Sequence, residues 1–203
     1  MSSTSGTASD TTALVVRGAS NVGRAVVEGL VAAGVDPVVL DERTPAGDRT
    51  PSVRVPFDDE QQVRSAVDDV ARDRGALDAV VFVPRPSRSG EDPWYRRPWE
   101  RQLARELLAM AAVARAAAGW VSAANGLVVL GSWSGSPSSD VAPLEARGFW
   151  PVLEALADDL GFRASAVELD PTGTASAATT LVEATTTGLG SVRDGVVASS
   201  RVG

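Results

Sequence analysis

The chain has 203 residues, of which 44% are hydrophobic and 22% are charged, and this length and composition are typical of a single globular domain. Its net charge of −7 argues against nucleic acid as the main partner, because binding to phosphates requires a basic surface. The sequence contains no Cys, His or Lys, which excludes disulfides, thiol nucleophiles, histidine bases, Schiff-base lysines and the usual zinc sites, so no metal site is expected.

The chain begins with a segment, residues 1–12, that is rich in Ser, Thr and Gly and predicts a disordered tail. This segment lacks the basic end and the apolar run of a signal peptide. The apolar stretches elsewhere are shorter than the ~20 residues that a membrane-spanning helix needs. We therefore expect a cytoplasmic protein without membrane contact, with one domain at residues 13–203.

After the tail, short apolar runs alternate with segments of helical periodicity. The apolar runs predict strands at 13–16, 37–40, 52–56, 77–83, 127–130 and 164–169, with a weak last strand at 195–198. The periodic segments predict helices at 22–33, 59–72, 99–119, 144–160 and 175–187, and the proline-rich segment 84–98 predicts a surface loop. This alternation predicts a Rossmann-like, doubly wound α/β fold, in which a parallel sheet lies between two layers of helices.

Three motifs follow one another in an order that a known enzyme family shares. Residues 13–30 place a strand, a glycine turn and a helix; residues 127–135 place a strand that ends on Ser132; and residues 170–174 form a Pro-Gly turn. In this order and spacing the chain resembles the short-chain dehydrogenases/reductases over roughly residues 13–174. The resemblance implies a Rossmann-like fold, an NAD(P) cofactor and oxidoreductase chemistry.

The chain departs from the active site that this resemblance implies. The family uses a Tyr, a Lys four positions later, and a Ser that orients the substrate. Ser132 matches the Ser, but the Tyr position falls on Ala142 or Glu145 and the Lys position on Ala146 or Phe149. The chain therefore resembles a degenerate member without the Tyr-x-x-x-Lys site. Glu145 is either a general base for an isomerisation, dehydration or cyclisation, with Ser132 as hydrogen-bond donor, or a solvated charge at a helix start.

The positions that bind the cofactor in the family are partly retained. By the resemblance, Gly18, Ala19 and Ser20 begin the nucleotide-binding turn and Gly23 ends it, whereas the middle glycine is missing. Asp41, at the end of the second strand, stands where a carboxylate would bind ribose hydroxyls and favour NAD over NADP; the alternative is a polar loop residue. We therefore expect no cofactor, with NAD as the alternative if the shortened turn still binds.

The helices after the fourth and fifth strands are the usual oligomer contact of the family. Aromatic and apolar side chains on these helices and on the preceding loop are therefore candidate interface residues, unless they fill the chain's own core. The candidates are Trp94, Tyr95, Trp99, Met110, Phe149, Trp150 and Leu153. The preferred interpretation is a catalytically silent subunit that associates with an active homologue, or with itself. The alternatives are an enzyme of altered chemistry, an unusual NAD(P)-dependent oxidoreductase and a nucleotide-binding sensor.

Overall fold

The computed structural model of the chain describes residues 11–43, 50–84, 96–133, 142–169 and 173–193. Its strands are β1 (Thr12–Val16), β2 (Asp36–Asp41), β3 (Ser52–Arg54), β4 (Ala79–Phe82), β5 (Leu127–Trp133) and β6 (Arg163–Leu169). They form one sheet in the order β3-β2-β1-β4-β5-β6, and every pair is parallel. The strand order reverses between β1 and β4, which makes this point the topological switch of a doubly wound sheet.

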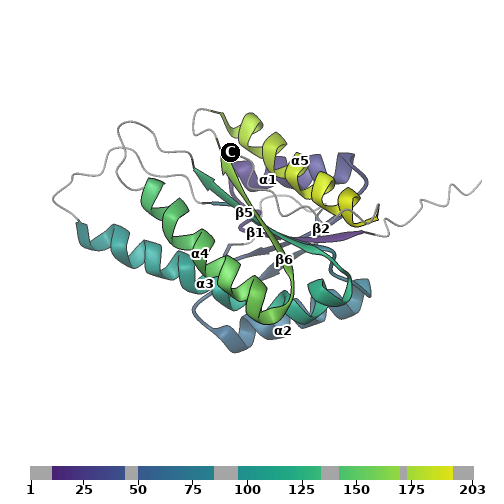
Figure 1. The fold of residues 1–203 in the computed structure, drawn as a ribbon, viewed down its shortest axis with the longest axis horizontal. Coiled ribbons are helices and arrows are strands. Elements are labelled where there is room, and N and C mark those ends of the chain that lie inside the picture. The colour runs from purple at the N-terminus through teal and green to yellow at the C-terminus, as the bar shows by residue number, and fades with distance from the viewer. Residues whose placement is uncertain (1–10, 44–49, 85–95, 134–141, 170–172, 194–203) are drawn as a thin grey trace, which may run out of the picture.

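Five helices cover both faces of the sheet (Figure 1). They are α1 (Asn21–Ala32), α2 (Glu60–Arg74), α3 (Arg96–Ala123), α4 (Ala142–Leu160) and α5 (Thr174–Arg193). Helices α1 and α5 pack on one face, whereas α2, α3 and α4 pack on the other. The predicted Rossmann-like, three-layer α/β/α fold is therefore confirmed.

The central strands are mainly apolar because both faces of the sheet are buried there. In β1, Leu14 and Val16 contribute to the core beneath α2, α3 and α4, whereas Ala13 and Val15 contribute to the core beneath α1 and α5. All four side chains are at most 1% exposed. The apolar runs in the sequence predicted these central strands correctly for this reason.

The first two helices begin at side-chain caps. Ser20 precedes α1, and its hydroxyl accepts a hydrogen bond of 2.9 Å from the Gly23 N–H. Asp59 precedes α2, and its carboxylate accepts hydrogen bonds from the backbone N–H and the side-chain amide of Gln62. These bonds stabilise the charged carboxylate and lower the pKa of Asp59. The caps fix the start of each helix close to the residue that its periodicity predicts.

Some element boundaries differ from the sequence prediction. Helix α3 already begins at Arg96, inside the predicted loop 84–98, because Pro98 lies in the first helical turn, where its missing N–H costs no hydrogen bond. Thr12, which the sequence assigned to the tail, belongs to β1. The remaining tail residues 1–10 and the predicted last strand at 195–198 lie outside the described residues.

One described stretch, Ala104–Ala123 in α3, is long and apolar enough by length and composition to cross a membrane. The expectation that every apolar stretch would be too short was therefore wrong. Half of this stretch is buried inside the fold, where it packs against the sheet and the neighbouring helices. Its apolar character is thus explained by its position as a core helix.

Candidate functional site

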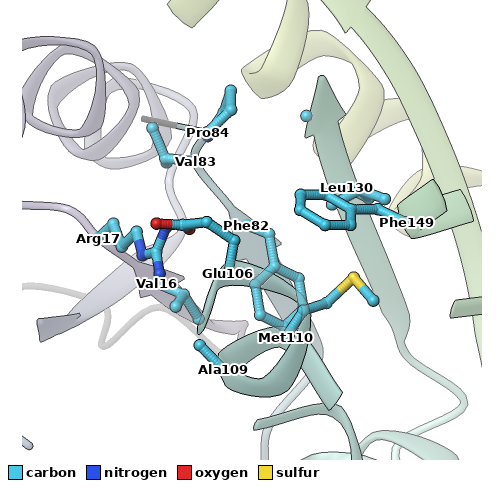
Figure 2. A pocket seen from close by; sticks show the side chains of 11 residues that line it. Val16, Arg17, Phe82, Val83, Pro84, Glu106, Ala109, Met110, Leu130 and Phe149 are labelled. Carbon is cyan, nitrogen blue, oxygen red and sulfur yellow. The ribbon is translucent and has the colours of Figure 1, made fainter. Parts of the chain in front are cut away.

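A small pocket lies at the carboxyl ends of β1, β4 and β5, beside the switch point of the sheet (Figure 2). Its volume is about 40 Å³, which is room for a few water molecules. Most of the wall is apolar, and its lining residues are Val16, Arg17, Phe82, Val83, Pro84, Glu106, Ala109, Met110, Leu130, Gly131 and Phe149. Ligands of doubly wound sheets bind at this position, so the pocket is the candidate functional site.

The charged part of the pocket is an ion pair between Arg17, directly after β1, and Glu106 on α3. The two side chains are only 10% and 11% exposed. The Arg17 guanidinium also lies 5.6 Å from the centre of the Phe57 ring, within the range of a cation–π interaction. The pair therefore joins the end of the first strand to the third helix across the switch point, largely out of contact with water.

Arg17 reaches this position through an unusual backbone conformation. Its φ is 67°, in the left-handed region, and its N–H donates a hydrogen bond of 2.7 Å to the Leu40 carbonyl on β2. The resemblance places Arg17 where the family has a Thr at the start of its turn. Neither Arg17 nor Glu106 was among the site residues predicted from the sequence. The only signal in the sequence was that Arg17 puts a cation where the family has a neutral Thr. A buried cation needs an anion beside it, so a carboxylate was to be expected nearby.

The predicted nucleotide-binding turn packs tightly against the start of α1. A Cβ at Gly23 would lie 2.6 Å from the Arg17 carbonyl oxygen and 2.6 Å from the Gly18 Cα. A Cβ at Gly18 would lie 2.7 Å from a methyl group of Val39 on β2. Both glycines are therefore needed for the close approach of the turn, the helix and the second strand. Ala19 and Ser20 lie between them, and Ser20 caps α1.

Asp41 lies beside this turn, as its place at the end of β2 predicted. Its buried carboxylate accepts two backbone hydrogen bonds of 3.0 Å, one from the Ala19 N–H and one from the Arg43 N–H. Asp41 thus ties the turn to the second strand. The N–H groups of Ala19 and Gly23 bind Asp41 and Ser20, so two donors of the turn are already engaged by the chain itself.

The two candidate catalytic residues are described only in their backbone. Ser132 lies in β5 and pairs with Glu168 of β6, and Glu145 lies in α4. Their side chains lie outside the described residues. Within the described part of the chain, no cluster of three or more acidic side chains could hold a metal ion.

Two predicted interface residues lie in the chain's own core instead. Met110 and Leu153 are buried between the helices and the sheet, so they are not available to a partner. Phe149 lines the pocket and Trp150 packs on the same core, both partly exposed. Trp99 belongs to α3, but its side chain is not described. Trp94 and Tyr95 lie outside the described residues.

Known proteins resemble the chain in structure rather than in sequence. No protein-family model matches the sequence, and no curated protein matches it either. A short chain dehydrogenase from Mycobacterium smegmatis is 18% identical with a TM-score of 0.68, and the match covers 86% of this chain and 85% of that chain.

The aldohexose dehydrogenase AldT from Thermoplasma acidophilum is 16% identical with a TM-score of 0.65, and the match covers 79% of this chain. The match spans 66% of the AldT chain, just under two thirds of its length. At these identities the likeness concerns the fold. The chain therefore has the Rossmann-like fold of these dehydrogenase structures.

Proposed function

We propose that the chain is a catalytically silent protein with the short-chain dehydrogenase fold, which acts in the cytoplasm as the partner of an active homologue. The buried Arg17–Glu106 pair carries this proposal. It lies at the switch point, in the crevice that a dinucleotide would cross, and it joins two elements that would have to flank the cofactor. Within the described residues, this ion pair thus lies in the crevice that the cofactor would need.

The described residues fit a dinucleotide poorly. The pocket of about 40 Å³ is far below the several hundred Å³ of a typical small-molecule site. The Asp41 carboxylate, expected to bind ribose, already accepts two backbone N–H groups, and two N–H donors of the turn are engaged internally. We therefore derive no hydride transfer for this chain.

The charged groups of the pocket also support catalytic silence. Arg17 stays charged at every physiological pH, so it can hold an anion but cannot serve as a base. Glu106 is engaged by Arg17, and the sequence has no Lys that would lower the pKa of a tyrosine.

The exposed face of α3 is the part of the fold on which we expect the partner to bind. Ala104, Leu108 and Gly119 are exposed and share one side of this helix by their spacing. Leu108 is 62% exposed, and Val31 on α1 is the other large hydrophobic side chain that is exposed in the described residues. Ala104 lies one turn before Leu108, and a small residue beside an apolar side chain allows another helix to approach closely. Arg115, on the same side of α3, pairs with Glu60 of α2.

Calorimetry with NAD and with NADP tests the first part of the proposal. The purified chain is expected to give no binding heat at cofactor concentrations up to about 1 mM, because the crevice is filled. An active homologue with the same fold serves as the positive control in the same buffer. Binding of either cofactor with micromolar affinity would overturn the proposal, since the turn would then still hold a dinucleotide.

Leu108→Glu tests the second part of the proposal. Complex formation with active short-chain dehydrogenases of the same genome is measured by size-exclusion chromatography with light scattering and by titration. The variant should weaken the complex at least about tenfold, because it buries a charge in the contact, while leaving thermal stability unchanged. Val31→Glu is the matched control, since Val31 is 57% exposed on the opposite face. Equal affinities for both variants would exclude α3 as the contact.

A further inference from the structure

The pocket at the switch point has two chemically different ends. At one end the Arg17 guanidinium and the Glu106 carboxylate point toward one another (Figure 2). The rest of the wall is apolar and includes Phe82, Met110 and Phe149. A guanidinium at the end of an apolar crevice is the arrangement that recognises a carboxylate with a short hydrocarbon chain.

Glu106 itself supplies such a group from within the chain. Its side chain carries a carboxylate on a short aliphatic stem, and this carboxylate binds Arg17 with only about a tenth of each side chain exposed. A buried guanidinium is stabilised only when an anion is well placed beside it. For Arg17, that anion is the Glu106 carboxylate on α3. Glu106 therefore shows which ligand chemistry the crevice accepts.

We propose that this crevice is a binding site for a short-chain carboxylate and that Glu106 holds it closed by occupying the guanidinium of Arg17. A carboxylate ligand would compete with Glu106 for Arg17, so the native chain binds it more weakly than a chain without the Glu106 carboxylate. The inference depends on the proposed function in one respect: no dinucleotide binds in the same crevice.

The size of the crevice limits the length of the ligand. Truncation of Glu106 to alanine removes two carbon atoms and both carboxylate oxygens, which are the heavy atoms of acetate. The pocket of about 40 Å³ beside them adds room for a few further carbon atoms. Propionate and butyrate therefore fit. Each methylene buried in the apolar part should strengthen binding about fourfold.

The test compares carboxylate binding by the native chain and by Glu106→Ala, using thermal unfolding and calorimetry with sodium acetate and sodium propionate. Glu106→Ala should bind propionate at least about tenfold more tightly than the native chain does, and its melting temperature should rise with propionate and saturate. Acetate should bind about fourfold more weakly than propionate, because it buries one methylene fewer. Sodium chloride at equal ionic strength controls for salt effects.

Two further variants make the result specific. Glu154→Ala removes an exposed glutamate of α4 and should behave as the native chain does. Arg17→Met combined with Glu106→Ala should abolish propionate binding, because the guanidinium is gone. Equal responses of Glu106→Ala and Glu154→Ala would overturn the inference, as would binding that survives the loss of Arg17.

The inference remains testable if Glu106→Ala does not fold alone. The variant is then refolded with and without propionate, and the native circular dichroism spectrum should return only with propionate and only when Arg17 is present. Failure of propionate to restore the spectrum would overturn the inference. A titration of NAD into the native chain runs in parallel: binding of NAD there overturns the proposed function, whereas the carboxylate result decides the inference separately.

Discussion

Gly23→Val is expected to destabilise the protein by about 3 kcal/mol or more, enough to prevent folding in a domain of ordinary stability. Even the first side-chain atom would lie 2.6 Å from the Arg17 carbonyl oxygen and 2.7 Å from the Gly18 carbonyl carbon. Both neighbours are backbone atoms, so neither can move aside by changing a rotamer. The turn would have to separate from α1, which would also disturb the Asp41 hydrogen bond to Ala19.

Gly119→Ala is the matched control for this variant. Gly119 lies in the interior of α3, and a Cβ there would meet no atom within 4 Å. The substitution should therefore raise stability by about 0.5–1 kcal/mol, through the higher helix propensity of alanine. Urea unfolding followed by circular dichroism measures both variants. A Gly23→Val protein as stable as Gly119→Ala would show that the turn does not pack on the helix as described.

The sequence predicted the layers of the fold well, because a parallel sheet covered on both faces leaves a strong apolar signal in its central strands. It was less accurate at helix ends. Pro98 indicated a loop, yet a proline fits the first turn of α3, where N–H groups have no helical partner. The Thr- and Gly-rich end of α5 also indicated an early stop. The helix continues to Arg193, since Leu189 packs on the core beneath α1 and α5.

The candidate site was only partly predictable. Motif spacing placed Gly18, Gly23 and Asp41 together correctly, because the carboxyl ends of β1 and β2 are neighbours in any fold of this class. Glu106 was not found. Its meeting with Arg17 depends on how α3 is rotated against the sheet, and a charged residue in a long helix carries no such information in its spacing. For the same reason, an apolar residue such as Leu153 could not be assigned to core or interface from sequence alone.

Arg17→Met and Glu106→Gln are each expected to destabilise the protein by about 3–5 kcal/mol, because each leaves a buried charge that has lost its counter-charge. The double variant should be more stable than either single variant. It removes both charges while keeping two side chains of similar length in the crevice, and Met remains suited to the Phe57 ring. The coupling energy from the double-mutant cycle should therefore reach about 2 kcal/mol or more.

The exposed pair Arg115–Glu60 is the internal reference for this cycle. Its side chains are 40% and 53% exposed, so its coupling energy should stay below about 1 kcal/mol. If both cycles gave equally small coupling, Arg17 and Glu106 would be solvated charges and the crevice would be open to a cofactor. If instead the Met–Gln double variant is as stable as the native chain, stability alone does not explain the buried pair. The function of Glu106 would then be to occupy the Arg17 guanidinium at the switch point, where a ligand carboxylate can replace the Glu106 carboxylate.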